Sequence, residues 1–404
     1  MNQQTSLSGN NKQQAAPPVP TLIVTAHPEF LDAALDELKQ LQKRLMLDEV
    51  LAPGIALCSV PNAAELLHRA AQQHLIFVRH LAPVQASVKL TNSEQDIGAL
   101  ALAIAALPTF SLLERGQRFA VQTRFVETSR GAGLPRPREP LDDGAMDTRA
   151  GQARAPTDKR PYSSGRLNQS LAEAISEETG AVESIKKPQI VISILCTTEK
   201  AYIGISPASD NLSPWPGGMR HFAQTSEQIS RAEFKLLEAL EVFGLSLPSR
   251  GHALDLGAAP GGWTRLLLEA GLSVVAVDPA KLDPRLLISP LSQHLEHYRG
   301  YAEGYLEEAI KKHRLFDVIA NDMRMDAREA SRLLVQAGKC LRRDGFIIST
   351  LKLPHATPTI DPMKNLKEAL HLLGRQFNIV QAHQLFHNRQ EVTVVTAQPR
   401  VTRS

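Results

Sequence analysis

One glycine-rich segment constrains the fold of this chain more than any other stretch. An apolar run, residues 253–256, leads into Gly257-Ala258-Ala259-Pro260-Gly261-Gly262-Trp263, which is typical of a strand, a tight turn and a helix start. Glycines let a backbone approach a ligand closely, and the first turn of a helix has free N–H groups. A second apolar run, 273–277, ends in Asp278, and a carboxylate there suits a ribose diol. The segment predicts a nucleoside-containing ligand at the edge of a parallel sheet.

This pattern resembles motif I of the Rossmann-fold methyltransferases that use S-adenosylmethionine (SAM). A dinucleotide-binding G-x-G-x-x-G is absent. The alternative is a glycine-rich strand–turn–helix without a ligand. The resemblance implies a cofactor site made of Asp255, Gly257, Ala259, Pro260, Gly261, Gly262, Trp263 and Asp278.

Length and composition limit the remaining possibilities. With 404 residues the chain has room for two or three domains, and no apolar run approaches a membrane span. Residues 1–20 are polar and lack the apolar core of a secretory signal, so we expect a disordered tail and a cytoplasmic protein. Cys58, Cys196 and Cys340 are far apart and the histidines show no zinc-like spacing, so neither a disulfide framework nor a metal site is expected.

The small positive charge of the chain is unevenly distributed. The formal net charge is +3, and residues 128–166 alone carry eight Lys/Arg and five Asp/Glu, a local excess of +3. That segment is also rich in Gly, Pro, Ala and Ser, which predicts a mobile basic insertion. A solvated insertion without function is the alternative.

The first half of the chain alternates strand and helix patterns. In chain order we expect a strand at 21–26, a helix at 31–45, a hairpin at 51–60 around Pro53-Gly54, a helix at 63–73, a strand at 75–81, a helix at 92–107, a strand at 118–124, a helix at 167–179 and strands at 189–195 and 200–206. The strings "RFAVQTRF", "SSGRLNQSLAEAI" and "PQIVISILCTTEKAYIGIS" resemble a THUMP domain. The resemblance implies that 21–206 is an RNA-binding region. The alternative is a generic α+β accessory domain.

A linker at 207–226 precedes the predicted catalytic domain, 227–404. There we expect helices at 228–243, 327–341 and 363–373, and strands at 253–256, 273–277, 294–298, 315–320, 345–351, 377–385 and 391–396. Alternating strands and helices that end in a hairpin predict an α/β fold, a doubly wound sheet with one antiparallel strand. This is the sheet of Rossmann-fold SAM methyltransferases.

Four charged residues indicate the chemistry. Lys235, Asp322, Lys352 and Glu391 occur in the order K-D-K-E, and the last three lie at predicted strand ends. The order resembles the tetrad of RNA ribose 2′-O methyltransferases of the FtsJ/RrmJ type. A ribose hydroxyl needs a base to attack a methyl group. We interpret Lys352 as that base, with its pKa lowered by Lys235 and by partial burial. The two carboxylates would hold the lysines.

Other methyltransferase classes fit less well. Enzymes that methylate a base nitrogen usually carry (D/N)-P-P-(Y/F) after strand four, and this chain has "NDMR". Enzymes that methylate a base C5 need a nucleophilic cysteine, and no cysteine lies near a motif.

Longer strings resemble one family in particular. "SRAEFKLLEAL", "LDLGAAPGGWTRLLLEAG", "STLKLP" and "AHQLFHNRQEVTVV" are similar to the bacterial large-subunit rRNA methyltransferase M (RlmM) family. The resemblance implies SAM as co-substrate without a metal, and 2′-O methylation of one cytidine of 23S rRNA. By position its cofactor contacts fall on Ser230, Ala259 to Gly262, Asp278, Glu303 and Asp322, and its proton acceptor falls on Lys352.

The chain departs from that family at several places. Glu303 stands where an aspartate is expected and Ala259 where a cysteine is usual, and the polar tail and basic insertion look unlike the family. Two alternatives stay open: 2′-O methylation of tRNA or another RNA, and a non-catalytic RNA-binding ribosome assembly factor.

Overall fold

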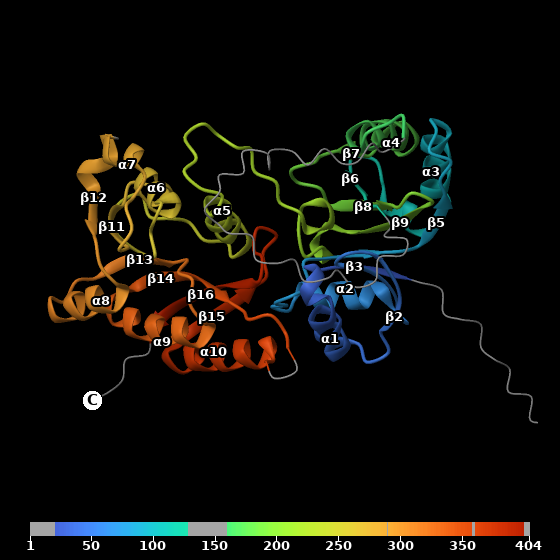
Figure 1. The fold of residues 1–404 in the computed structure, drawn as a ribbon. Helices are drawn as coiled ribbons and strands as arrows, with labels where there is room; N and C mark the ends of the chain where they lie inside the picture. Colours follow the sequence, from blue (N-terminus) through green and yellow to red (C-terminus); the bar gives the residue numbers. More distant parts are fainter. Residues whose placement is uncertain (1–20, 128–159, 289, 358–359, 400–404) are drawn as a thin grey trace, which may run out of the picture.

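The chain folds into two lobes (Figure 1). The structure is a computed structural model that describes residues 21–127, 160–288, 290–357 and 360–399. One lobe contains two small sheets, and the other is built around a seven-stranded sheet. The predicted tail, 1–20, and most of the predicted basic insertion lie outside the described residues.

The first sheet of the N-terminal lobe is antiparallel, in the order β2-β3-β1-β4. The predicted hairpin around Pro53-Gly54 is confirmed. Gly54 has φ +76°, and a Cβ there would lie 2.3 Å from the carbonyl oxygen of Ala26. The elements are β1 (Leu22–Thr25), α1 (Leu31–Leu41), β2 (Met46–Ala52), β3 (Ile55–Ser59), α2 (Ala63–Ala71) and β4 (His80–Pro83).

The strand predicted at 75–81 is wrong over most of its length, because β4 begins only at His80. The backbone N–H groups of Ile76 and Phe77 donate to the carboxylate of Glu37, each at 2.9 Å. A half-buried side chain therefore takes the place of a neighbouring strand. An apolar run alone does not reveal such a partner.

The second sheet has the order β5-β9-β8-β6-β7, with β6 and β8 parallel. The sequence patterns predicted β6, β8 and β9 and missed the short strands β5 and β7. Helix α4 begins at Ser164, capped by the Ser163 side chain, so the last residues of the predicted insertion are helical. The elements are β5 (Ala86–Lys89), α3 (Gln95–Ala105), β6 (Arg118–Phe125), α4 (Ser164–Thr179), β7 (Val182–Glu183), β8 (Ile190–Cys196) and β9 (Lys200–Pro207). The assignment of this lobe to the THUMP domains stays a prediction.

The C-terminal lobe confirms the predicted doubly wound sheet. Its strand order is β12-β11-β10-β13-β14-β16-β15, and β16 alone runs antiparallel to its neighbours. The elements are α5 (Glu233–Val242), β10 (His252–Leu256), α6 (Gly262–Glu269), β11 (Ser273–Val277), α7 (Pro284–Ile288), β12 (Leu295–Tyr298), α8 (Ala302–Lys311), β13 (Phe316–Asn321), α9 (Ala327–Ala337), β14 (Leu341–Lys352), α10 (Pro362–Gln376), β15 (Phe377–His383) and β16 (Glu391–Pro399).

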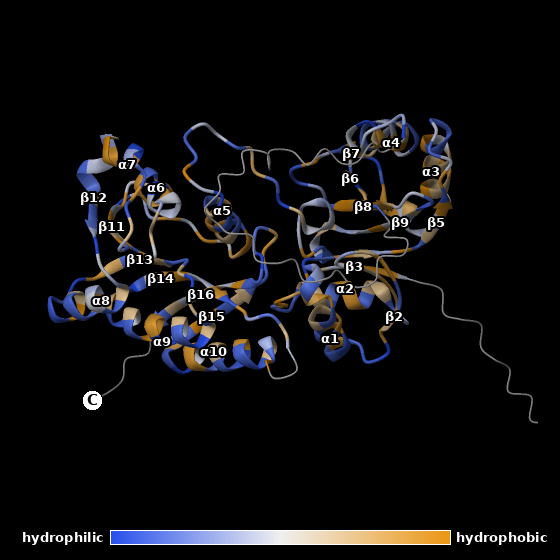
Figure 2. Ribbon diagram, viewed as in Figure 1, coloured by the Kyte–Doolittle hydropathy of each residue, from blue (hydrophilic) through white to orange (hydrophobic). Residues whose placement is uncertain are grey.

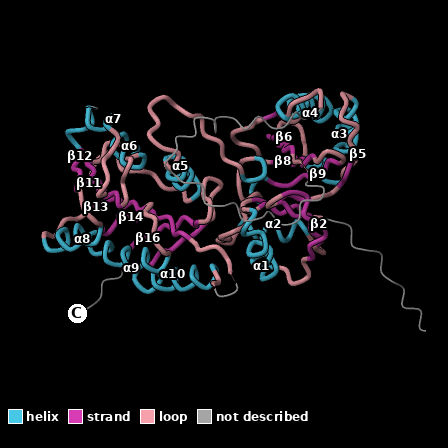
Figure 3. Tube along the Cα trace, viewed as in Figure 1, coloured by secondary structure: helices cyan, strands magenta, loops and turns pink. Residues whose placement is uncertain are grey.

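Helices cover both faces of this sheet. Buried residues of α5, α6 and α7 form one apolar cluster with the sheet, and those of α8, α9 and α10 belong to another. The outer helices are amphipathic, with hydrophilic residues on the outward side of α9 and α10 (Figure 2). The tube view shows the helices flanking the strands and long loops between the lobes (Figure 3). Ligand-binding groups are expected at the carboxyl ends of the strands.

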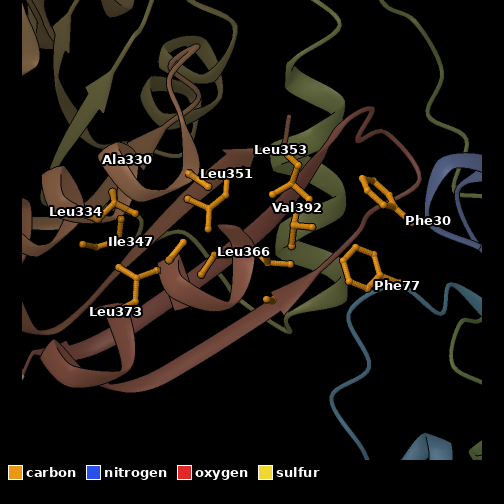
Figure 4. Packing of buried hydrophobic residues seen from close by; sticks show 14 of the residues in the cluster. Phe30, Phe77, Ala330, Leu334, Ile347, Leu351, Leu353, Leu366, Leu373 and Val392 are labelled. Atoms are coloured by element: carbon orange, nitrogen blue, oxygen red, sulfur yellow. The ribbon is translucent and has the colours of Figure 1, made fainter. Parts of the chain in front are cut away.

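The two lobes share one apolar core. Phe30 and Phe77 of the first sheet's layer belong to the same buried cluster as Leu353 and Val392 of the C-terminal lobe. Figure 4 shows the two phenylalanine rings beside these two aliphatic side chains. Burying such rings strongly favours a fixed contact between the lobes.

No helix in the described parts of the chain has the length and apolarity needed to cross a membrane. The three cysteines are buried and none forms a disulfide.

Candidate active site

The glycine loop joins the ends of three neighbouring strands. It follows β10, and the N–H of Ala259 donates to Asp278 Oδ2 at 3.0 Å, next to the end of β11. Gly257 has φ +73°, and a Cβ there would lie 2.3 Å from the Met323 side chain in the loop after β13. Only glycine fits this conformation and this close approach. The loop is thus held where β10 lies between its two parallel neighbours, the point at which α/β sheets bind ligands.

The segment before α5 forms one wall of this site. Glu233 is 1% exposed, and its carboxylate accepts hydrogen bonds from the N–H groups of Ile229 and Ser230 at 2.7 and 3.3 Å. It also pairs with Arg265 of α6. The hydroxyl of Ser230 is buried without a hydrogen-bond partner among the described residues. A buried orphan hydroxyl needs a polar partner, and the amino or carboxylate group of SAM fits that need.

Gly262→Ala is expected to weaken SAM binding at least about tenfold, a loss of roughly 1.4 kcal/mol. A Cβ at Gly262 would lie 2.3 Å from Ser230 Oγ and 3.0 Å from Glu233 Cγ, so it would displace the hydroxyl that we expect to meet the ligand. Calorimetric titration with SAM measures the effect. Gly374→Ala is the matched control, since a Cβ there meets nothing within 4 Å. Equal SAM affinity in both variants would argue against this site.

Three residues predicted to contact the cofactor differ in their surroundings: Trp263 and Asp255 are buried, and Glu303 is exposed. Trp263 is 3% exposed, and its indole N–H donates to the carbonyl of Ala232 at 2.7 Å, so its ring packs in the core. Asp255 is 1% exposed and accepts a hydrogen bond from Thr264 Oγ1 at 2.6 Å. Both side chains are buried and support the glycine loop from the core. Glu303 is exposed on the first turn of α8 and makes no hydrogen bond or ion pair with the described residues. It stays a proposed adenosine contact.

The other predicted contacts follow the course of the loop. The carbonyl of Pro260 accepts a hydrogen bond from the N–H of Asp283 at 2.8 Å. Gly261, with φ +113°, ends the loop directly before α6. Asp278 also accepts from the N–H of Ala280 at 2.8 Å, which fixes its carboxylate.

Asp255→Asn is expected to make the free energy of unfolding less dependent on pH. Burial raises the pKa of Asp255 to about 7, against partial relief by its hydrogen bond with Thr264. The native state then keeps a proton that the unfolded chain releases near pH 4, so native stability falls as pH rises from 4 to 7. The wild type should lose up to about 1.4 kcal/mol per pH unit relative to the variant in this window. Denaturant unfolding of both proteins at pH 5, 6 and 7 measures it. Parallel curves would contradict the expected protonation of Asp255.

The four predicted tetrad residues come together at the carboxyl edge of the sheet. Asp322 follows β13, Lys352 ends β14, and Glu391 begins the antiparallel β16 directly opposite Lys352. Lys235 reaches them from α5. Each lysine pairs with each carboxylate: Lys235 Nζ lies 3.2 Å from Asp322 and 2.7 Å from Glu391, and Lys352 Nζ lies 2.6 Å from Asp322 and pairs closely with Glu391.

Lys352 has a third partner, which the sequence reasoning missed. Its Nζ donates to Thr350 Oγ1 at 2.8 Å, and the Thr350 hydroxyl donates to Asp322. An ammonium has three N–H donors. All three are used, by Asp322, Glu391 and Thr350. The signal was present in the sequence, because residues two apart on a strand share a face.

The predicted fall in the pKa of Lys352 is wrong. Burial lowers its pKa, but the charges of Asp322 and Glu391 and their hydrogen bonds outweigh burial and raise it above the ordinary lysine value. Burial likewise raises the pKa of Asp322, and the two lysines more than compensate, so its net shift is downward. In this arrangement Lys352 is an ammonium at neutral pH and Asp322 a carboxylate.

Among the described residues, no group of three or more His, Cys, Asp or Glu side chains is arranged to hold a metal ion. Each tetrad carboxylate is instead engaged by lysine ammonium groups.

One family of known proteins matches the part of the chain that contains Lys235, Asp322 and Lys352. The FtsJ-like methyltransferase family matches residues 228–385. This part of the chain is therefore an FtsJ-like methyltransferase domain, with the fold that binds SAM.

At the level of named relatives, the chain is similar to Ribosomal RNA large subunit methyltransferase M. The protein of that name from Marinobacter nauticus is 34% identical over 211 residues, which cover 50% of this chain and 55% of the relative. The one from Pseudomonas syringae pv. tomato is 28% identical over 232 residues, 55% of this chain and 62% of the relative. The matches thus span little more than half the length of these relatives. The predicted resemblance to the RlmM family is confirmed over this part.

Solved structures are similar only distantly. TrmN from Thermus thermophilus aligns with 94% of this chain and all of its own, at 19% identity and a TM-score of 0.36. Fibrillarin from Aeropyrum pernix, solved with SAM, aligns with 51% of this chain and 82% of its own, at 16% identity and a TM-score of 0.33.

Proposed function

We propose that this chain transfers the methyl group of SAM to a ribose 2′-hydroxyl of RNA. The observation that carries the proposal is the set of four ion pairs in which each of Lys235 and Lys352 contacts both Asp322 and Glu391, beside the glycine loop. Two lysines and two carboxylates provide a proton acceptor and the charges that position it.

In the proposed reaction Lys352 acts as the base. SAM, when bound, supplies a methyl group on a positively charged sulfur. The hydroxyl oxygen forms the new bond to the methyl carbon, the carbon–sulfur bond breaks with its electron pair going to sulfur, and the hydroxyl proton moves to Lys352 Nζ. Only the neutral amine can accept this proton, so the Lys352 ammonium, whose three N–H donors bind Asp322, Thr350 and Glu391 in the free protein, first releases one proton to solvent. Asp322 and Glu391 hold its Nζ in place, and Lys235 balances their charge.

The proposed substrate is large-subunit rRNA, with a cytidine of 23S rRNA as the acceptor. This rests on the names of the relatives and on the proposed RNA-binding role of residues 21–206. Arg124 on β6 is half-buried, and desolvation lowers its pKa to about 10, so this cation does not carry the proposed RNA-binding role. Methylation of tRNA or another RNA is the competing target.

Transfer of labelled methyl groups from SAM tests the proposal. The full-length protein is incubated with total RNA from a strain that lacks the gene, and ribose-methylated positions are mapped in both rRNA and tRNA. A new 2′-O-methyl cytidine in 23S rRNA is the expected result. A product in tRNA would move the target, and a product on a base would overturn the reaction class. SAM binding without any RNA product would favour the non-catalytic assembly factor.

A further inference from the structure

The turn that brings Glu391 into the site is held by the N-terminal lobe. Residues 384–390 connect β15 to β16, and Glu391 is the first residue of β16. Arg79, directly before β4, donates from Nε to Gln384 Oε1 at 2.8 Å and from Nη2 to the Leu385 carbonyl at 2.7 Å. Arg79 is 8% exposed and Gln384 is fully buried. This contact between the lobes is therefore largely removed from water, and a hydrogen bond from a charged group is strong in such surroundings.

Backbone hydrogen bonds add to the contact between Arg79 and this turn. The N–H of Gln384 donates to the Ile76 carbonyl at 2.7 Å, and His383 Nδ1 lies 2.9 Å from the Leu75 carbonyl. The segment 75–79 thus uses its carbonyl groups to bind the end of β15. This segment does not form the predicted strand because its backbone groups are hydrogen-bonded to the catalytic lobe and to Glu37.

A buried network carries the contact from this turn to the tetrad. Asn388 is 3% exposed, and its Oδ1 accepts hydrogen bonds from the Leu385 N–H at 2.8 Å and from Thr393 Oγ1 at 3.0 Å. Its Nδ2 lies 3.5 Å from Glu391 Oε1. Leu385, which Arg79 binds through its carbonyl, is therefore joined through Asn388 to the catalytic carboxylate.

Helix α5 holds the same turn from the opposite side. The carboxylate of Glu238, 3% exposed, accepts from the N–H groups of Phe386 and His387 at 2.8 and 2.9 Å. Glu238 lies three residues after Lys235 on the same helix face. The turn is thus fixed between the N-terminal lobe and the helix that carries the other lysine of the tetrad.

Apolar packing makes the connection rigid. Phe30 and Phe77 share a buried cluster with Leu353 and Val392, the residues that directly follow Lys352 and Glu391 (Figure 4). The N-terminal lobe therefore contacts the immediate chain neighbours of two tetrad residues. Densely packed interiors transmit small displacements with little loss.

We propose that Arg79 is a positioning residue for methyl transfer: by holding the turn 384–390 it sets the position of Glu391 against Lys352. The N-terminal lobe then takes part in the chemical step as well as in any binding of RNA. This inference rests on the proposed function, because it assumes that the tetrad performs the transfer.

The test uses full-length Arg79→Met and Arg79→Lys, with Arg69→Met as the matched control. Arg69 lies on α2 of the same lobe, and its side chain is 45% exposed. Single-turnover transfer at saturating SAM and RNA is measured against pH, together with the dissociation constants of SAM and RNA. We expect both Arg79 variants to transfer at least tenfold more slowly, with both dissociation constants within about twofold of the wild type. Lysine lacks the planar fork that reaches Gln384 and Leu385 together, so it should not rescue.

The pH profile separates positioning from a general loss of structure. A displaced Glu391 leaves Lys352 with one nearby carboxylate, so the rising limb of the profile should move to lower pH in both Arg79 variants. The double variant Arg79→Met with Asn388→Ala should be no slower than the slower single variant, because both interrupt one network. If Arg79→Met does not fold, Gln384→Met removes the side-chain acceptor of Arg79 Nε while the Leu385 carbonyl remains, and it should move the profile in the same direction by a smaller amount.

Three results would overturn the inference. The first is a wild-type single-turnover rate in the Arg79 variants at saturating RNA, with only RNA affinity reduced. The second is a slower rate with an unmoved pH profile. The third is multiplication of the two single effects in the double variant. A wild type that transfers no methyl group to RNA would instead contradict the proposed function, so the two failures are distinguishable.

Discussion

Replacing Lys352 with either alanine or arginine is expected to slow methyl transfer to RNA by about 10²- to 10⁴-fold, the usual contribution of a positioned base. Alanine removes both the charge and the amine. Arginine keeps the charge for Asp322 and Glu391 but does not lose its proton in proteins. Equal losses in the two variants would identify proton acceptance as the role of Lys352, since its electrostatic role survives in the arginine variant.

Single-turnover transfer to rRNA, with both substrates saturating, is the measurement. The affinity for SAM should change little, because Lys352 lies on β14 and the glycine loop follows β10. Lys367→Arg, at an exposed position on α10, controls for the substitution itself. An arginine variant that retains more than a tenth of the wild-type rate would show that the charge, and not the proton transfer, is what the site needs.

Much of this site was accessible from sequence because three of the four tetrad residues lie at the end of a strand. Asp322 and Lys352 follow the predicted strands 315–320 and 345–351, whose length and composition are typical of buried strands. Parallel strands bring their carboxyl ends to one edge, so two of the four side chains were placed by topology alone. Glu391 begins an antiparallel strand, and its arrival at the same edge follows only from the strand order β14-β16-β15.

What the sequence could not reveal depends on side chains that meet from distant elements. The sequence predicted a lower pKa for Lys352 because a neighbouring Lys235 and partial burial both disfavour its charge. That prediction leaves out the carboxylates that reach the amine. The structure places Asp322, Glu391 and Thr350 all on its Nζ, and the two charges decide the direction of the shift. Motif position suggested that Trp263 contacts the cofactor, but α6 turns its ring inward to the Ala232 carbonyl.

The connection between the lobes was equally hidden. Residues 75–79 carry an apolar pattern that favours a strand, but their backbone groups form hydrogen bonds with Glu37 and with the end of β15. Tertiary contacts here override the local preference. An apolar sequence pattern predicts a strand for such a segment. In this fold, however, residues 75–79 join the N-terminal lobe to the C-terminal lobe.

The rate of methyl transfer is expected to rise roughly tenfold per pH unit between pH 7 and 9, the behaviour of a base that is mostly protonated in this range. The pKa of Lys352 is raised, so only a small neutral fraction exists at pH 7, and this fraction grows tenfold with each unit until pH approaches the pKa. Glu391→Gln should move the rising limb to lower pH, because Nζ loses the attraction of one carboxylate while glutamine keeps an acceptor oxygen. The surface variant Glu368→Gln, whose side chain is 43% exposed, should leave the limb in place. Single-turnover rates of the three proteins across this range are the measurement. A flat wild-type profile, or the same limb in Glu391→Gln, would show that deprotonation of Lys352 does not limit the reaction.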